Sequence, residues 1–318
     1  MSATDWGLVG DIGATNARFA LVAPDGTLGT TRVLLCDDYP TIADAIAAYL
    51  KEATGTKPAA AVLAVAATPA GDAVSMTNHP WAFSIEALRQ TIGLERLKVV
   101  NDFHANAAVV PYLAANERTQ VGPGAPVSDA PIGVIGPGTG LGVSALVPTP
   151  NGPMPIPGEG GHVTMSPADA RESAVLEVMR ERYDHVSAER VLSGPGLVNL
   201  YNTLCELSHV KAAPFTAAQV TDPKIGAADA CAHEATAMFC AMLGTIAGNL
   251  ALTLGARGGI YIAGGIVPKL ADTFAQSQFR ERFEAKGRFR DYLAEIPTYV
   301  IVRPFAALLG AAKLLDGG

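Results

Sequence analysis

The sequence predicts an α/β fold made of two lobes. Its 318 residues exceed the usual size of one hydrophobic core, and 49% of them are apolar whereas only 17% are charged, which favours compact folding. Strand-like and helix-like segments alternate along the chain. Each half begins with two apolar strands that bracket a turn containing Gly and Thr. These observations predict one α/β layer structure in each half.

The first half opens with a predicted β-hairpin over residues 6–22, because β-forming residues flank the turn segment Gly13–Asn16. The elements expected after it alternate between helix and strand: a helix over 42–50, a strand over 61–66, a helix after the capping residue Ser84, a strand over 97–100 and a helix over 104–113.

The second half follows a loop rich in Gly, Pro and Asn, roughly 116–131. It opens with two apolar strands within 132–147. The elements expected after them are helices over 169–184, 194–207 and 228–254, a strand over 259–263 and an amphipathic helix over 305–315. We expect residues 1–112 and 303–318 to form a small lobe, and 113–302 a large one.

Charge and cysteine content exclude several classes of function. A net charge of −7 and a pI near 5.4, without any Lys/Arg-rich run, argue against partners such as nucleic acid or anionic lipid. The four cysteines form no C-x-x-C pair and have no zinc-ligand spacing, so we expect reduced thiols. The first residues lack the basic segment of a secretory signal, which predicts a cytoplasmic protein.

One uncharged stretch, 235–256, is long enough to cross a bilayer. Thr, Gly and Asn interrupt it and much of the rest is Ala, so its transfer into lipid would be unfavourable compared with a Leu-rich span. We expect a buried core helix and no membrane contact.

Two glycine-containing turns are candidates for phosphate binding, because glycine lets backbone N–H groups crowd an anion. The first comprises Gly10, Asp11, Ile12, Gly13, Ala14 and Thr15, and the second comprises Gly138, Thr139 and Gly140, followed by Leu141 and Gly142. Neither matches the Walker or the dinucleotide pattern. Each turn alone could be an ordinary tight hairpin, but one turn in each half favours a nucleotide held between lobes.

Asp11 lies at the end of a strand in apolar surroundings, where an unpaired carboxylate is costly and a nearby cation would relieve the cost. This placement favours a role near Mg²⁺. The alternative is a carboxylate that caps the N–H groups of its own hairpin.

Asn101 and Asp102 follow a strand at its carboxyl end, where open α/β sheets present ligand-binding residues. In phosphoryl transfer to an alcohol, a carboxylate accepts the hydroxyl proton and an amide can orient a neighbouring hydroxyl. The alternative is a helix N-cap, which is a common place for Asp.

Glu159 and His162 stand three residues apart in a glycine-rich turn, so both can face one small ligand such as a polyol. A metal site is the alternative, although no further ligands have convincing spacing. Glu189 alone would be interpreted as a solvated helix charge. Gly264 and Gly265 follow a strand and could let an adenine lie against the backbone, or form an ordinary strand-to-helix turn.

Taken together, these segments resemble the bacterial glucokinase family, in its ATP-dependent form without the cysteine-rich zinc motif. The resemblance runs end to end and is carried by these segments: 10–18, 77–84, 101–103, 138–142, 158–162, 187–196 and 262–267. Two departures stand out. Ala14 replaces a glycine that is frequent in the family, and the segment 68–71 follows the family's sugar-side loop only loosely.

The resemblance implies the two-lobed actin-like ATPase fold (ribonuclease H-like), with the active site in the interlobe cleft, and ATP-dependent phosphorylation of glucose with Mg²⁺. It implies that Asp102 is the catalytic base and that the sugar ligands are Asn101, Asp102, Glu159, His162 and Glu189. The turns 10–15 and 138–140 would bind phosphate, and Gly264 and Gly265 would lie near adenosine. A homodimer is expected. A kinase of another hexose or amino sugar, or a sugar-sensing regulator without catalysis, are the alternatives.

Overall fold

The computed structural model describes residues 5–53, 56–67, 69 and 71–315. Thr68 and Ala70, in the expected sugar-side loop, lie outside these residues. The chain divides into two compact units. Unit 1 comprises the residues up to Ala114, Pro153–Pro157 and the residues from Arg303 onward, and unit 2 comprises Ala115–Gly152 and Gly158–Val302. The expected division differs most at 153–157, a short segment whose lobe no sequence periodicity indicates.

Unit 1 is built on a five-stranded sheet with the order β3-β2-β1-β4-β7. Its strands are β1 (Gly7–Ile12), β2 (Asn16–Val22), β3 (Arg32–Leu35), β4 (Ala60–Val65) and β7 (Arg96–Asn101), and a small hairpin consists of β5 (Ala73–Ser75) and β6 (Ala82–Ser84). Its helices are α1 (Ile42–Glu52), α2 (Ile85–Ile92), α3 (Asp102–Val109) and α12 (Ala306–Lys313). β1 pairs antiparallel with β2, as the predicted hairpin requires, and it also pairs parallel with β4.

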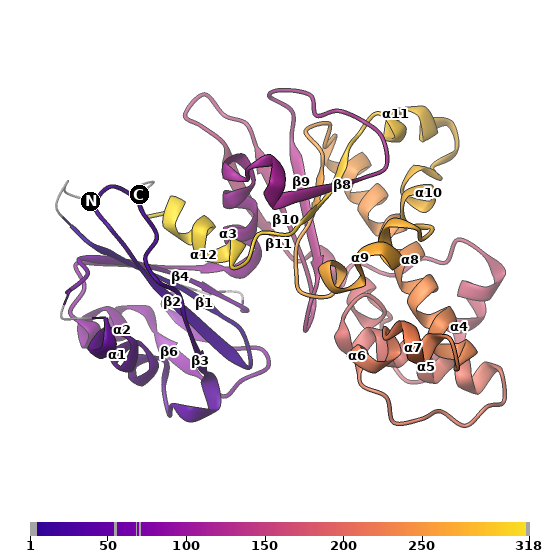
Figure 1. Cartoon of the computed structure of the whole chain (residues 1–318), viewed down its shortest axis with the longest axis horizontal. Helices are drawn as coiled ribbons and strands as arrows, with labels where there is room; N and C mark the ends of the chain where they lie inside the picture. Colours follow the sequence, from indigo (N-terminus) through magenta and orange to yellow (C-terminus); the bar gives the residue numbers. More distant parts are fainter. Residues whose placement is uncertain (1–4, 54–55, 68, 70, 316–318) are drawn as a thin grey trace. The chain divides into compact units, whose positions relative to one another are not determined.

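Side chains of β1 alternate between two cores, because successive residues of a strand point to opposite faces. Leu8 and Ile12 belong to the core that contains Ile46 of α1, whereas Val9 belongs to the core that contains Ala105 of α3 and Leu308 of α12. Figure 1 shows α1 and α2 on one face of this sheet and α12 on the other. Residue 11 therefore lies on the face covered by α3 and α12.

The three parallel strands of unit 1 end in register. Ile12 of β1 is opposite Val65 of β4, and Val65 is opposite Asn101 of β7. Adjacent strands lie about 4.8 Å apart, so the ends of β1 and β7 are separated by roughly 10 Å. The segments that follow these strands consequently lie along one edge of the sheet.

Unit 2 carries most of a six-stranded sheet with the order β11-β10-β9-β12-β13-β8. Its own strands are β8 (Arg118–Val121), β9 (Ile132–Pro137), β10 (Leu141–Val147), β12 (Ile260–Ile262) and β13 (Thr298–Ile301), whereas β11 (Met154–Gly158) consists mainly of residues that cluster with unit 1. Its helices are α4 (Ala170–Arg180), α5 (Gly194–Leu207), α6 (Ala217–Val220), α7 (Pro223–Gly226), α8 (Ala230–Leu254), α9 (Val267–Ala275), α10 (Phe279–Glu284) and α11 (Arg290–Ala294).

The long helix α8 is the centre of unit 2. It packs against α5, α10 and β9, and its side chains form a large part of the core of this unit. Among the described residues it is the one helix long and apolar enough to span a bilayer, but 67% of its most apolar window is buried in the protein. This burial supports the interpretation of 235–256 as a core helix.

Two sequence predictions, for residues 116–131 and 104–113, need correction. The composition of 116–131 predicts a loop, but β8 lies within this segment and pairs antiparallel with β13. The helix expected over 104–113 begins earlier, at Asp102, and ends at Val109. β8 reads Arg-Thr-Gln-Val and only its last residue is buried, so no apolar alternation marks it, and its pairing with the distant β13 makes it a strand.

Gly310 allows α12 to approach α3 closely. A Cβ atom on Gly310 would clash with the backbone carbonyl of Ala105. Although Gly→Ala is favourable in most helices, we expect Gly310→Ala to lower the free energy of unfolding by about 1–3 kcal/mol, because a backbone atom cannot move aside as a side chain can. Urea unfolding followed by circular dichroism measures this.

Gly226→Ala is the matched control, because its Cβ would meet His233 at an ordinary 3.8 Å. This variant should be as stable as the wild type or slightly more stable. Equal stability of the two variants would contradict the assigned clash.

Candidate functional site

The first predicted phosphate segment, 10–15, divides into a strand part and a turn part. Gly10, Asp11 and Ile12 belong to β1, and only Gly13, Ala14 and Thr15 form the turn before β2. The Gly13 N–H donates to the carbonyl of Asn16 over 3.0 Å and closes this turn. Gly10 has a packing reason to be glycine, because a Cβ there would lie 2.7 Å from Leu63 Cδ2. The exposed Thr15 and its neighbours are the part of the segment that can meet an anion.

Asp11 faces Arg18 across the hairpin. Arg18 Nη1 donates to Asp11 Oδ2 over 3.1 Å, and the two residues are register partners of β1 and β2. Burial raises the pKa of the Asp11 carboxyl above its ordinary value, although the Arg18 guanidinium partly lowers it again. The described contacts of this carboxylate therefore favour an ion pair over capping of the hairpin N–H groups.

Asn101 and Asp102 occupy the junction of β7 and α3. Asn101 Oδ1 accepts from the Phe103 N–H over 2.8 Å, and its Nδ2 donates to the carbonyl of Ala67 over 3.2 Å. Asn101 is thus the N-cap of α3, a role that the sequence analysis considered for Asp102. Asp102 is the first helical residue, and its Oδ1 also accepts from the Phe103 N–H, over 2.9 Å. The hydrogen bonds of the Asn101 amide fix the backbone at the start of α3 and therefore the position of the Asp102 Cα–Cβ bond.

The second predicted phosphate turn and the glycine pair 264–265 lie together at one edge of the sheet of unit 2. β9 and β12 run parallel, with Ile135 opposite Ile262, so both strands end at this edge. Gly264 has a φ of +85°, and a Cβ on it would clash with the carbonyl of Pro137. Close contact of these two strand ends therefore requires glycine at 264. At Gly138 and Gly265 no atom beyond the adjacent residues lies within 4 Å of the position that a Cβ would take, so their surroundings are open.

Unit 2 also brings Glu159, His162 and Glu189 near the start of β10. Glu159 Oε2 lies 3.9 Å from His162 Nε2, and both side chains are more than half exposed, at 58% and 59%. The short turn 160–162 packs against β10 and against the turn 188–190 that carries Glu189. Glu189 Oε2 accepts from the Leu141 N–H over 2.8 Å. The interpretation of Glu189 alone as a solvated helix charge is therefore wrong.

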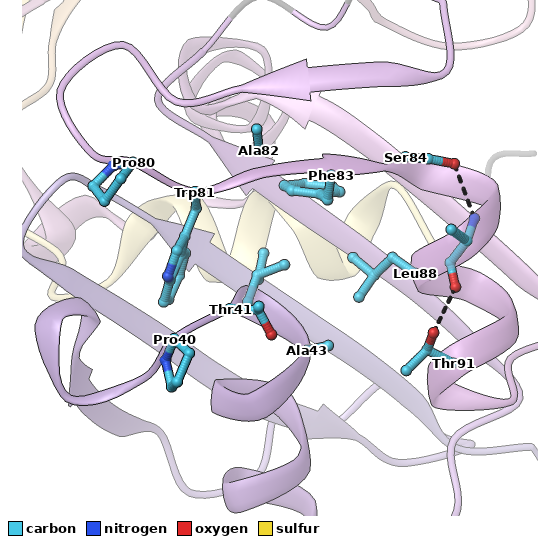
Figure 2. Close-up of a pocket in the computed structure, with 12 residues that line it drawn as sticks. Pro40, Thr41, Ala43, Pro80, Trp81, Ala82, Phe83, Ser84, Leu88 and Thr91 are labelled. Atoms are coloured by element: carbon cyan, nitrogen blue, oxygen red, sulfur yellow. Dashed lines mark hydrogen bonds between the residues drawn. The ribbon is translucent and has the colours of Figure 1, made fainter.

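A pocket of about 300 Å³ lies in unit 1 and contains none of these residues. Trp81, Phe83 and Leu88 line it together with Thr41 and Thr91 (Figure 2). Its hydroxyl groups bond within the protein; Thr91 Oγ1, for example, donates to the Ala87 carbonyl over 2.8 Å. The Trp81 indole N–H donates to the Tyr39 carbonyl. The pocket therefore offers no convergent polar groups for a phosphate or sugar.

Sequence reasoning assigned no individual contact to Arg18, Leu141 or Gly194. Arg18 could have been found by pairing residues across the predicted hairpin, which places it opposite Asp11. The other two act through backbone groups: the Leu141 N–H binds Glu189, and the Gly194 N–H donates to the Gly138 carbonyl over 2.8 Å. No side-chain pattern signals such contacts. Within the described residues, no group of three or more His, Cys, Asp or Glu could hold a metal ion.

Comparison with known proteins identifies the family and the fold. The family model described as Glucokinase matches residues 8–317. The chain is 50% identical over 311 residues to a protein of Aromatoleum aromaticum named Glucokinase, covering 97% of this chain and 94% of that protein. It is 51% identical over 310 residues to a protein of the same name from Paramagnetospirillum magneticum, covering 97% of both.

A crystal structure of glucokinase from an Antarctic psychrotroph has the same fold, with a TM-score of 0.87 at 33% identity over 99% of both chains. The two-sheet α/β architecture is therefore that of the actin-like ATPase fold of these enzymes. With relatives of this identity over nearly its whole length and a matching family model, the chain belongs to the glucokinase family.

Proposed function

We propose that this protein is a glucokinase that transfers the γ-phosphoryl group of ATP to the 6-hydroxyl of D-glucose. Family membership supports this activity, as the relatives at about 50% identity bear that name. The observation that carries the chemistry is the β7–α3 junction, where a capped helix start presents Asp102 at the carboxyl end of a parallel strand.

In unit 1, Asp102 accepts the proton of the sugar hydroxyl as phosphoryl transfer proceeds. A general base must be held where it meets this proton, and the Asn101 cap supplies the fixed position. The two hydrogen bonds to Phe103 and Ala67 hold the Asn101 amide in one orientation. One N–H and one lone pair of this amide remain to bind a sugar hydroxyl. Most of the rate acceleration then comes from orientation of the nucleophile.

In unit 2, Glu159, His162 and Glu189 are assigned to the remaining hydroxyls of the hexose. Carboxylates accept from vicinal hydroxyls and an imidazole can donate or accept, so this set recognises a polyol. The exposure of Glu159 and His162 supports the assignment, because both side chains can reach a ligand from solvent.

The nucleotide is assigned to the turns 13–15 and 138–140, with adenosine near Gly264 and Gly265. Mg²⁺ keeps several water ligands beside phosphate oxygens, so a nearby protein carboxylate can act on the ion indirectly, through one of these waters. Asp11 suits this role, because burial of its carboxylate makes the ionised form costly and a cation would relieve that cost. Bound Mg²⁺ would neutralise charge on the phosphate oxygens during transfer.

We further propose a homodimer that works in the cytoplasm, where ATP is available. Four buried free cysteines agree with a reducing compartment. Light scattering coupled to size-exclusion chromatography measures the oligomeric state.

A coupled assay of ADP release with a panel of hexoses, amino sugars and phosphoryl donors tests the proposed kinase activity. Binding of glucose without ADP release would contradict this activity.

Replacement of Asp102 tests the assigned base. General-base catalysis contributes typically about 10²- to 10⁴-fold, so Asp102→Ala should lower kcat by at least about 10²-fold while the protein stays folded. Glu95→Ala, at an exposed position of the same unit, is the control and should keep wild-type kcat. Near-wild-type turnover by Asp102→Ala in the ADP-release assay would remove the assignment.

Substitution of Asp11 by Asn should raise stability at pH 7 and lower activity. A carboxyl with a raised pKa stabilises the fold below its unfolded-state pKa of about 4, and this contribution is lost as pH rises through the folded-state pKa. Asp11→Asn removes this cost of ionisation. We expect it to raise the melting temperature at pH 7, with the gain shrinking towards pH 4, and to lower phosphorylation by about tenfold or more.

Asp25→Asn is the control, because the pKa of Asp25 is shifted in the opposite direction from that of Asp11. Its exposed carboxylate accepts from the Thr27 N–H, which lowers the pKa of Asp25, so this carboxylate stabilises the fold above its unfolded-state pKa. Asp25→Asn should slightly lower the melting temperature at pH 7 and keep activity. Scanning calorimetry between pH 4 and pH 7 measures both variants, and a lower melting temperature of Asp11→Asn at pH 7 would refute the expectation.

A further inference from the structure

Two hydrogen bonds from one segment hold the glycine turn 138–140 of unit 2. The Gly194 N–H donates to the Gly138 carbonyl over 2.8 Å, and Glu189 Oε2 accepts from the Leu141 N–H over 2.8 Å. Within the turn, the Gly138 N–H donates to the Gly140 carbonyl over 2.8 Å. The segment 189–194 therefore holds the turn at its first residue and immediately after its last.

The position of the Glu189 side chain explains why residue 140 is glycine. A Cβ on Gly140 would clash with Glu189 Oε2, and apart from its two chain neighbours no other residue lies within 4 Å of that Cβ position. The backbone of Gly140 is outside the left-handed region, so an alanine there meets no backbone strain. The one obstacle to a larger residue is the end of a flexible side chain, which would be displaced and would lose the Leu141 N–H.

Glu189 is itself held in place through its backbone. It projects from the short turn 188–190, and its own carbonyl accepts from Ser193 Oγ over 2.8 Å. The Ser193 hydroxyl in turn accepts from the Gly196 N–H over 3.0 Å as the N-cap of α5. The carboxylate is half-buried, and among the described residues its second oxygen, Oε1, has no hydrogen-bond partner. One oxygen is thus committed to the turn and the other remains available.

We propose that Glu189 is a positioning residue for the nucleotide phosphate turn, in addition to its assigned contact with the hexose. This inference rests on the proposed function, which assigns the turn 138–140 to phosphate. Through Oε2 the carboxylate fixes the Leu141 N–H and hence the exit of the turn, while Oε1 accepts from a sugar hydroxyl. One side chain thereby links the hexose to the conformation of the phosphate turn.

Nucleotide binding without sugar separates this role from sugar contact alone. Isothermal titration of Mg²⁺ and the non-hydrolysable analogue AMPPNP, with no glucose present, should show about tenfold weaker binding by Glu189→Ala, because a buried N–H loses its charged acceptor. Glu189→Gln keeps an acceptor oxygen and should bind AMPPNP within about threefold of the wild type. His162→Ala, which removes an assigned sugar contact without touching the turn, should weaken glucose binding and leave AMPPNP affinity unchanged.

Gly140→Ala gives an independent test that does not alter Glu189 chemically. It should weaken AMPPNP binding as much as Glu189→Ala does, and combining the two substitutions should add little, because both remove the same contact. Equal AMPPNP affinity of Glu189→Ala and the wild type, or fully additive losses in the double variant, would overturn the proposal. If the wild type itself bound no AMPPNP, the assignment of the nucleotide site would fail. If the wild type released ADP in the presence of sugar but Glu189→Ala bound AMPPNP as tightly as the wild type, only the positioning role would fail. Melting temperatures of all variants verify that they are folded.

Discussion

The parallel pairing of strands that end in register is the constraint on which the rest of the molecule depends. In unit 1, hydrogen bonding aligns Ile12, Val65 and Asn101 across three strands, so the β1–β2 turn and the start of α3 lie at one edge. In unit 2, the pairing of β9 with β12 aligns the turn 138–140 with the pair 264–265. Backbone hydrogen bonds thus bring distant parts of the sequence together before any side chain acts.

Helix caps and strand ends convert this alignment into chemistry. Asn101 illustrates the point, because one amide caps α3, binds the carbonyl of Ala67 beyond β4 and fixes the position of Asp102. Gly310 serves the same region from a distance, as it lets α12 pack closely on the helix that Asp102 begins. The position of the assigned base consequently depends on packing far along the chain.

The glycines of the motifs serve different physical ends, although they look alike in the sequence. Gly10 admits the side chain of Leu63, Gly264 admits the carbonyl of Pro137, and Gly140 admits the carboxylate of Glu189. Gly138 has open space around it, which is what contact with an anion requires. A glycine-rich motif therefore combines residues that meet a ligand with residues that let the protein pack against itself.

The sequence by itself determined the hairpins, the main helices, the core character of α8 and, through ordered motifs, the family. These features depend on local periodicity, turn composition and caps, which neighbouring residues carry. Only the tertiary structure decided that Asn101 rather than Asp102 caps α3, that 118–121 is a strand, and that Glu189 binds the backbone at Leu141. Each of these depends on a partner 34 to 177 residues away or on a backbone group, and neither leaves a pattern in the local sequence.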